Sequence, residues 1–454
     1  MRLLYNFRGV AGEELTPDLA LRIGNLAADI LDGDVAVGSD HRTSSPMLKA
    51  ALTAGLLSKG LEVTDYGVLP TPVLAYLVKE KHGGGAMVTA SHNPPEWNGI
   101  KFFDADGLVF GPEEENYVRD RIDETLRFEE WRKLASLSIN FQGKIFYEER
   151  VLEQVNIGSR ELRIVVDAGG GVGALLVPDI LERMGFNVVK LYCDLDPFFS
   201  GRPPEPRPEN LNALSSTIRE VGADVGFAYD GDCDRVVIYD ERGRYVPGNL
   251  GMIYLADNFV PDGSKIVVNV TGFFGMRKVF DGRYRLIPEK WGQTFLQKRM
   301  KLEGSIFGGE PDGHYMWPGL FQSYADAIFS TVKFVEAMSN TKEKLSEALS
   351  KYPPLKLLRV KSEPWDGSFI EMRDDIISFM EKISDSVYTE IDTHLLYAES
   401  DMFGLTVRQS HWDKTVRVEV EAMSTLEANR IIHEIYDRLL RPRGIRIPSL
   451  QQEK

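Results

Sequence analysis

Three aspartates stand at alternate positions in the segment AYDGDCDRVVIYD: Asp230, Asp232 and Asp234. Carboxylates this close repel one another unless a cation lies between them, and oxygen ligands at this density suit Mg²⁺ or Ca²⁺. A calcium loop of the EF-hand type would need glycine at its sixth position, where this chain has Arg235. The following residues read as a strand, so the segment predicts a site for a hard cation rather than an EF-hand or a solvated acidic turn.

A serine and a histidine, Ser91 and His92, adjoin two prolines in the segment VTASHNPPEWNGIKFF, which also contains Lys101. The pair suggests a hydrolase, but the G-x-S-x-G elbow is absent and adjacent residues rarely orient an imidazole onto the neighbouring hydroxyl. A serine that carries a phosphoryl group beside a metal fits better, because Mg²⁺, lysine and arginine then supply positioning and charge neutralisation.

The glycine-rich segment FGGEPDGHY places two carboxylates and an imidazole together, at Glu310, Asp312 and His314. Such groups can hydrogen-bond sugar hydroxyls or carry protons. The alternative is an ordinary surface turn.

The segment RQSHWDKTVR places Arg408, Ser410 and Arg417 around an expected strand-loop-strand. Arginines with a hydroxyl donor can form an anion receptor through bidentate bonds to phosphate oxygens, and a solvated hairpin is the alternative. Arg8 in NFRGV and Arg42 in SDHRTSS could add to the same positive field.

A glycine loop, VVDAGGGVGA, matches the dinucleotide-binding pattern G-x-G-x-x-[GA] through Gly169, Gly171 and Ala174, with Asp194 further on. Such loops also serve simply to turn a strand sharply into a helix. A nucleotide-dependent oxidoreductase is therefore an alternative function.

The elements that must position these groups repeat along the chain. The first helix is expected to begin at Pro17 behind Thr16, and the second runs from Pro46 to Gly60 between two apolar strands. Similar strand-helix-strand units follow at 161–194 and from 264, whereas the end of the chain has alternating strands and amphipathic helices. This pattern predicts three similar α/β domains with mostly parallel mixed sheets, over 1–150, 151–245 and 246–355, and a smaller α+β domain over 356–454.

The composition excludes several classes of protein. The 454 residues exceed one ordinary core, and 43% apolar with 27% charged residues is typical of a globular protein. A net charge of −15 disfavours nucleic-acid and anionic-membrane partners. Two cysteines and the absence of a long apolar run predict a soluble, cytoplasmic protein.

The motifs TASHNP, DGDCDR, GEPDGH and RQS followed by VRVEVE, in this order, resemble those of the α-D-phosphohexomutases. That superfamily includes phosphomannomutase/phosphoglucomutase and phosphoglucosamine mutase. The resemblance runs from Arg8 to Arg417 and implies four domains around a central cleft, the first three alike. It also implies Mg²⁺, one per chain, and a hexose 1,6-bisphosphate as activator.

The resemblance assigns roles to particular residues. It makes Ser91 a phosphoserine, which binds Mg²⁺ together with the three aspartates. Lys101 or His314 would act as general acid/base, and the transfer site would be completed by His92 and Arg235. The substrate would be bound by Glu310, Asp312, Arg408, Ser410, Arg417, Arg8 and Arg42.

The implied reaction interconverts a hexose 6-phosphate and its 1-phosphate, with mannose or glucose favoured. Alternatives are a phosphoglucosamine mutase, or a sugar-phosphate-binding or bisphosphate-forming protein of the same fold. Two departures bear on this choice: Asp312 stands where the family commonly has serine, and the loop Gln409–Lys414 lacks the usual R-P-S-G-T-E-P pattern. A homo-oligomer is compatible with the sequence.

Overall fold

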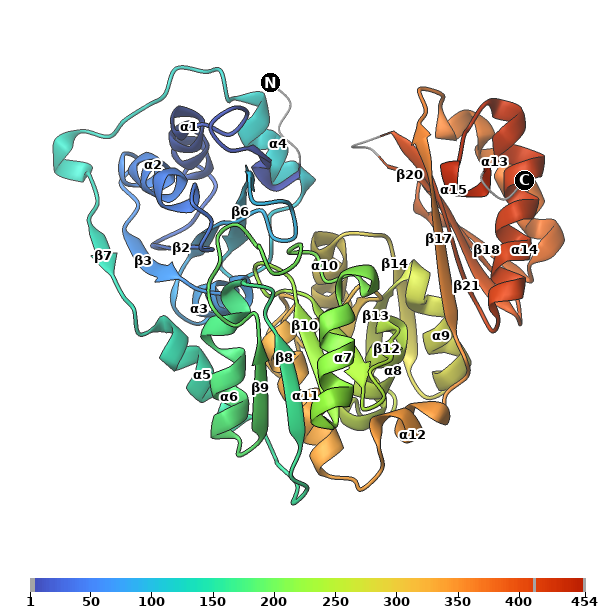
Figure 1. Cartoon of the computed structure of the whole chain (residues 1–454). Helices are drawn as coiled ribbons and strands as arrows, with labels where there is room; N and C mark the ends of the chain where they lie inside the picture. The colour runs from blue at the N-terminus through green and yellow to red at the C-terminus, as the bar shows by residue number, and fades with distance from the viewer. Residues whose placement is uncertain (1–4, 411–413, 452–454) are drawn as a thin grey trace. The chain divides into compact units, whose positions relative to one another are not determined.

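The computed structural model describes residues 5–410 and 414–451, and these form two compact units. Unit 1 holds the chain up to Val246 and again from Asp312 to Ala348, whereas unit 2 holds Pro247–Pro311 and the chain from Leu349 onward. Figure 1 labels the elements of each unit. Among the described residues, no helix is both long and apolar enough to cross a membrane.

The first sheet of unit 1 has the strand order β6-β4-β2-β3-β7, and all neighbours are parallel except β4 and β6. Val35 and Val37 pack in one core with the first two helices, and the intervening Ala36 is also buried, so both faces of the sheet are covered. The elements of this region are β1 (Gly9–Val10), α1 (Pro17–Ala27), β2 (Val35–Ser39), α2 (Ser45–Leu57), β3 (Val63–Val68), α3 (Thr71–Lys81), β4 (Gly84–Val88), β5 (Trp97–Asn98), β6 (Ile100–Asp104), α4 (Pro112–Asp120), β7 (Leu137–Ile139) and α5 (Gly143–Glu153).

The second sheet of unit 1 has the order β12-β11-β10-β8-β9, with β10, β8 and β9 parallel and the other neighbours antiparallel. Its core includes Val165 of β8 and Leu214 and Ile218 of α7, the helix packed on the sheet. The remaining elements of unit 1, of which β16 is not a strand of this sheet, are β8 (Arg163–Asp167), α6 (Val177–Arg183), β9 (Asn187–Leu191), α7 (Asn212–Val221), β10 (Val225–Tyr229), β11 (Val236–Asp240), β12 (Tyr245–Val246), β16 (His314–Met316) and α11 (Ala327–Ser339).

Unit 2 contains one parallel set of strands and one antiparallel sheet. The parallel set has the order β14-β13-β15, and the antiparallel sheet has the order β17-β21-β20-β19-β18. Ile376 and Ile431 of two helices pack on Val418 of the antiparallel sheet. The elements are α8 (Gly248–Phe259), β13 (Lys265–Asn269), α9 (Val270–Phe280), β14 (Arg285–Glu289), α10 (Gln293–Glu303), β15 (Phe307–Glu310), α12 (Leu345–Ser350, which runs in from unit 1), β17 (Lys356–Pro364), α13 (Phe369–Ile383), β18 (Ser386–Asp392), β19 (Leu395–Glu399), β20 (Phe403–Gln409), β21 (Thr415–Ala422), α14 (Thr425–Ile435) and α15 (Pro448–Gln451).

The predicted fold class is confirmed: three α/β regions with mixed sheets precede an antiparallel α+β region. Helix α1 begins at Pro17 behind Thr16 as expected, and α2 begins one residue before the predicted Pro46. Residues 121–142 carry no element predicted from the sequence, but the structure places β7 there as the last strand of the first sheet. This strand is three residues long and exposed, so it lacks the buried periodicity that reveals a strand.

Candidate active site

Ser91 lies in the loop that follows β4, at the carboxyl edge of the first sheet. Its side chain is 2% exposed and its backbone has φ +53°, a conformation that costs free energy outside glycine and that the surroundings must hold in place. The backbone N–H of Ser91 donates to Thr89 Oγ1 at 2.9 Å. Gly231 lies so close to the carbonyl of Ser91 that an added Cβ would meet the oxygen at 2.5 Å, which only glycine avoids.

Arg42 fixes the serine loop rather than reaching toward a ligand. Its side chain is fully buried, and its Nε donates to Asp40 at 3.0 Å. Its remaining four N–H groups donate to the carbonyls of Ser91, Asn93, Pro94 and Trp97. All five donors of the guanidinium are therefore engaged within the protein, which gives Arg42 a positioning role in place of the substrate contact expected from the sequence.

The three aspartates occupy the hairpin between β10 and β11, and all are buried. Carboxylate oxygens of Asp230, Asp232 and Asp234 lie within 4.8 Å of one another. Ser91 Oγ donates to Asp230 Oδ2 at 2.9 Å, so the candidate phosphoserine and the candidate metal ligands form one site. Burial and the neighbouring Asp234 raise the pKa of Asp230 well above its ordinary value.

The donor set fits Mg²⁺. It consists of hard carboxylate oxygens next to a hydroxyl that could carry a phosphoryl group. Asp232 Oδ1 is buried and has no hydrogen-bond partner among the described residues, as expected of an oxygen that is available to a cation.

Lys101 projects from β6 into the same cluster. Its Nζ donates to Asp232 at 2.8 Å, to Asp234 at 2.9 Å and to the hydroxyl of Tyr324 at 3.0 Å. Although burial alone would lower the pKa of Lys101, these two carboxylates raise it, so the side chain is an ammonium ion. Tyr324 was not predicted as a site residue, because a lone tyrosine before a helix carries no recognisable signal.

His314 lies on β16 between two carboxylates. Its Nδ1 is 3.0 Å from Asp312 and its Nε2 is 3.3 Å from Asp234. Burial would lower the pKa of His314, but Asp312 and Asp234 raise it well above its ordinary value, so both ring nitrogens carry protons. Arg235 Nε also lies 3.2 Å from His314 Nε2. Gly313 packs against the backbone of Val236, where any side chain would clash.

His92 and Arg8 complete the surroundings of Ser91. His92 Nδ1 lies 3.1 Å from Ser91 Oγ, and burial together with Arg235 and Arg8 lowers the pKa of His92 well below its ordinary value. The imidazole is therefore neutral. Arg8 donates to Asn93 Oδ1 at 3.2 Å. Burial lowers the pKa of Arg8, but arginine remains charged, so Arg8 and Arg235 supply positive charge beside the serine.

Glu310 belongs to unit 2, at the end of β15. Its Oε1 accepts hydrogen bonds from the side chain of Asn269 at 3.3 Å and from the backbone of Gly292 at 3.2 Å. Two segments of unit 2 thus orient this carboxylate, which was predicted to bind sugar hydroxyls.

The predicted phosphate-binding residues of unit 2 lie on strands β20 and β21 of the antiparallel sheet or directly after β20. Arg408 on β20 stands directly opposite Arg417 on β21, and Ser410 follows at the end of β20. Arg408 Nε donates to Glu419 at 3.3 Å, and its guanidinium lies over the indole of Trp291 at 5.2 Å. His411 and Trp412 of the altered loop lie outside the described residues. Only the geometry, and no sequence signal, identifies Trp291.

The glycine loop after β8 binds a protein side chain. Asp167 Oδ1 accepts from the backbone of Gly169 at 2.9 Å and from Arg202 Nε at 2.9 Å. Arg202 also donates to the carbonyl of Tyr229, the residue before the aspartate hairpin, at 2.7 Å. Arg202 thus ties β8 to the aspartate hairpin, and a Cβ added at Gly169 would meet its guanidinium carbon at 2.5 Å. This packing is a structural reason for the glycine and weighs against the dinucleotide alternative.

Comparison with known proteins identifies related sequences and structures. Three family models match, described as phosphoglucomutase/phosphomannomutase α/β/α domains I, II and III, over residues 4–128, 146–243 and 248–355. A protein of Methanopyrus kandleri described as a probable phosphoglucosamine mutase is 35% identical over 95% of both chains. The crystal structure of a phosphoglucomutase/phosphomannomutase family protein from Burkholderia thailandensis has a TM-score of 0.86 and 25% identity, with 98% of both chains covered. An Aspergillus fumigatus N-acetylphosphoglucosamine mutase, solved with GlcNAc-6P and magnesium, shares the fold at a TM-score of 0.61 and 14% identity, covering 95% of this chain and 93% of that one.

Proposed function

The chain belongs to the phosphoglucomutase/phosphomannomutase family of α-D-phosphohexomutases, and we propose that it interconverts a hexose 6-phosphate and its 1-phosphate through a phosphoserine at Ser91. The observation that carries the proposal is the 2.9 Å hydrogen bond from Ser91 Oγ to Asp230, within a buried cluster of three carboxylates. A serine in this place is positioned for a phosphoryl group whose charge Mg²⁺ neutralises.

Asp230, Asp232 and Asp234 would hold the Mg²⁺, which when bound supplies a positive charge to the phosphoryl oxygens. A sugar hydroxyl attacks the phosphorus of phosphoserine and gives up its proton, the bond from phosphorus to Ser91 Oγ breaks, and Ser91 Oγ takes up a proton in turn. The products are a hexose 1,6-bisphosphate and free Ser91. In the return step the other phosphate is transferred to Ser91, which leaves the isomeric monophosphate. The bisphosphate also serves as the activator that first phosphorylates Ser91.

We assign proton transfer to His314, and to Lys101 the role of a positive charge held in a fixed position. The three protein acceptors of the Lys101 ammonium hold it firmly in place, and its pKa is raised from a value already far above neutrality. An imidazolium exchanges a proton more readily near neutral pH, even with its pKa raised, because its ordinary value is close to 6.5. Arg8 and Arg235 bind the phosphoryl group that is transferred, while Arg408, Ser410 and Arg417 bind the phosphate that does not react.

We assign glucosamine 6-phosphate as the first sugar to test, ahead of the mannose and glucose phosphates favoured by the sequence analysis. The Methanopyrus relative is described as a probable phosphoglucosamine mutase. Asp312, which replaces the family's common serine, also adds a carboxylate that suits an ammonium group better than a hydroxyl.

Phosphorus NMR tests both the activity and the sugar. The protein is incubated with Mg²⁺, a trace of hexose 1,6-bisphosphate and one of the three 6-phosphates: glucosamine, mannose or glucose. We expect a 1-phosphate resonance in each active tube, fastest with glucosamine 6-phosphate. No resonance in any tube, with Ser91 shown to be phosphorylated by mass spectrometry, would contradict the mutase and favour a sugar-phosphate-binding protein.

A further inference from the structure

Three neighbouring strands of unit 2, β17, β21 and β20, place four cations next to one another (Figure 1). Lys361 on β17 lies directly opposite Arg417 on β21, which lies directly opposite Arg408 on β20. In the next row, Arg359 on β17 lies opposite Glu419 on β21. Side chains of opposite residues point to the same face of a sheet, and so do those of residues two apart along a strand. All five charged side chains therefore share one face.

This charged face is turned away from the helices that cover the sheet. Val407 and Val418 lie in the core with α13 and α14, and Val360 packs against that core. Successive residues of a strand point to opposite faces, so the charged residues between these valines lie on the other side. On that side Lys361 is exposed, and the side chain of Arg359 is 38% exposed. A ligand from solution can therefore reach both residues of β17.

Positive charge exceeds negative charge on this face. In the two rows, four side chains are cations and Glu419 is the one anion, which leaves a net charge of +3. Burial lowers the pKa of Arg408, and the neighbouring charges of Arg417 and Arg359 lower it further, against the effect of Glu419. Arginine nevertheless remains charged, so the cations repel one another until an anion binds among them.

Two of the guanidinium groups are held in place by Glu419 and Trp291. Arg359 Nε lies 3.5 Å from Glu419, and Arg408 Nε donates to the same carboxylate at 3.3 Å. Trp291 Nε1 also donates to Glu419, at 3.0 Å, and both guanidinium groups lie over its indole, at 5.1 and 5.2 Å. Within the described part of the chain, the Nη groups of Arg359 and Arg408 form no hydrogen bond. Such groups suit bidentate bonds to phosphate oxygens.

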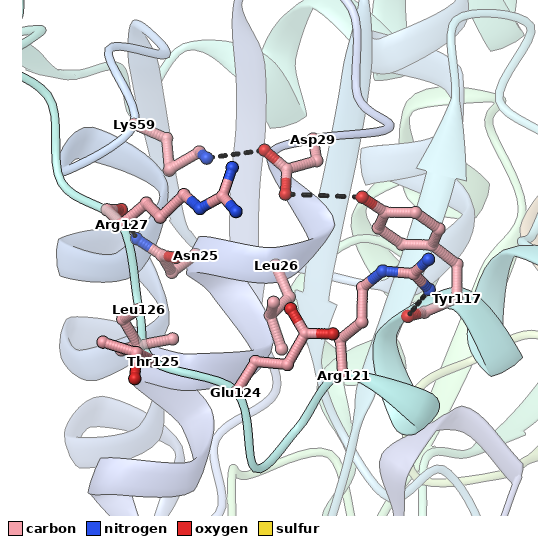
Figure 2. Close-up of a pocket in the computed structure, with 10 residues that line it drawn as sticks. All are labelled: Asn25, Leu26, Asp29, Lys59, Tyr117, Arg121, Glu124, Thr125, Leu126 and Arg127. Atoms are coloured by element: carbon pink, nitrogen blue, oxygen red, sulfur yellow. Dashed lines mark hydrogen bonds and ion pairs between the residues drawn. The ribbon is translucent and has the colours of Figure 1, made fainter.

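A group of cations in unit 1 lacks this surplus of charge. Figure 2 shows Lys59 paired with Asp29 at 2.6 Å, in a pocket that Arg121, Glu124 and Arg127 also line. Two carboxylates thus stand beside three cations, which leaves one positive charge instead of three. The strands of unit 2 are therefore the better candidate for binding a doubly charged anion.

We propose that Arg359 and Lys361 bind the substrate phosphate that does not react, together with Arg408 and Arg417. The identity of the anion rests on the proposed function. In this arrangement three strands form the phosphate site, and β17 supplies cations in addition to those of the hairpin whose loop departs from the family pattern. Trp291 and Glu419 are positioning residues, because they orient the guanidinium groups without contacting the phosphate.

Kinetics of single variants test the two new residues. Arg359→Gln and Lys361→Gln should each raise KM for the hexose 6-phosphate about 10-fold and change kcat little, because each removes one charge-assisted bond. Lys361→Arg keeps the charge and should restore most of the affinity. Lys356→Gln is the matched control, since Lys356 is an exposed lysine of the same strand that lies opposite Ala422 at its other end. An unchanged KM in both glutamine variants would overturn the proposal.

Binding of inorganic phosphate tests the site without turnover. Trp291 contacts both guanidinium groups, so the part of the tryptophan emission change that is absent in Trp291→Phe reports phosphate at this site. We expect the double variant Arg359→Gln, Lys361→Gln to weaken this binding by about 10-fold or more and Lys356→Gln to leave it unchanged. Weakened binding in a protein without mutase activity would support the site and contradict the proposed function. Unchanged binding in an active mutase would overturn the site alone.

Discussion

The candidate transfer site of unit 1 and the candidate phosphate-binding site of unit 2 are built in different ways. In unit 1, buried charges from separate strands and loops contact one another directly, as Lys101 does with Asp232 and Asp234 at 2.8 and 2.9 Å. In unit 2, Arg408 and Arg417 sit side by side on adjacent strands, and Arg408 bonds to Glu419 through one nitrogen. The charged side chains of the first site hold one another in place, whereas those of the second site project from two adjacent strands of a hairpin.

This difference matches what the proposed reaction requires of each site. Phosphoryl transfer gains rate from charges fixed before the substrate arrives, because fixed charges need no reorganisation in the transition state. A phosphate that does not react needs only affinity, and it must be bound in either orientation of the sugar. Substitutions in the transfer site should therefore mainly lower turnover, whereas substitutions in the hairpin site should mainly weaken substrate affinity.

The largest effect is expected at Ser91. Ser91→Ala removes the atom that carries the phosphoryl group, so turnover should fall by at least about 10³-fold, while binding of the sugar phosphate stays measurable. Turnover is measured by phosphorus NMR and binding by calorimetry. Ser216→Ala on α7, whose hydroxyl donates to the Ala213 carbonyl away from the site, is the control and should be near wild type. Substantial isomerisation by Ser91→Ala would refute the phosphoserine.

His314 should give the next largest effect, about 10²- to 10³-fold in kcat. Its pKa is raised, so it is protonated below its folded-state pKa and its action as an acid is lost as pH rises through that value. His314→Gln should remove this alkaline limb from the pH profile of kcat. His82→Gln, whose ring bonds to Asp34 outside the site, should keep the limb. A limb that survives in His314→Gln would assign the proton to Lys101.

Arg42 tests whether the rigidity of the serine loop matters for turnover. Lysine has three donors in place of five, so Arg42→Lys leaves loop carbonyls unpaired and displaces Ser91, for an expected loss of about 10²-fold in kcat with little change in KM. Arg22→Lys is the control, since Arg22 also donates to loop carbonyls of unit 1, those of Ile122 and Glu124. A change in KM alone would indicate that Arg42 binds the substrate, as expected from the sequence.

Much of this arrangement could be predicted from the sequence, and the missing parts have two causes. The sequence identified Ser91, Lys101 and the aspartates because their motifs carry unusual combinations of residue types. Tyr324 and Trp291 were missed because an aromatic residue in such a place looks like ordinary core.

The role of Arg42 was also missed, for a different reason. A sequence shows that an arginine is present but not where its five donors point, and the four carbonyls that it binds come from a loop about 50 residues later in the chain. Side chains whose task is to hold other groups carry no motif of their own. Only the geometry separates them from residues that bind substrate.

Arg408 should show the opposite kinetic pattern to Arg42. Each charge-assisted hydrogen bond to phosphate contributes about 1.5–3 kcal/mol, so Arg408→Ala should raise KM roughly 10- to 100-fold and change kcat much less. Arg430→Ala on α14, whose partners are the nearby Glu427 and Glu434, is the control. An unchanged KM would mean that the altered hairpin no longer binds phosphate.

Glu421 extends the comparison to buried carboxylates. In unit 1, Asp234 is buried, but Lys101 and His314 hold its pKa well below the ordinary value. Glu421 on β21 is equally buried, yet it accepts hydrogen bonds from neutral donors, the backbone of Gly275 at 2.9 Å and the side chain of Asn249. Burial without a contacting cation raises the pKa of Glu421 to about 7.

This pKa predicts a pH-dependent stability with a definite sign. Between about pH 4.5 and 7 the folded protein binds a proton at Glu421 that the unfolded chain does not, so stability falls as pH rises through this range, by at most about 3 kcal/mol. Glu421→Gln carries no charge at any pH and should be free of this loss. The difference in melting temperature between Glu421→Gln and the wild type should therefore increase by several degrees from pH 5 to pH 8. The same difference for Glu381→Gln, at an exposed residue of α13, should change little with pH. A flat difference for Glu421→Gln would mean that its carboxylate is already charged at pH 5, and that a buried acid in unit 2 is compensated as fully as those of the transfer site.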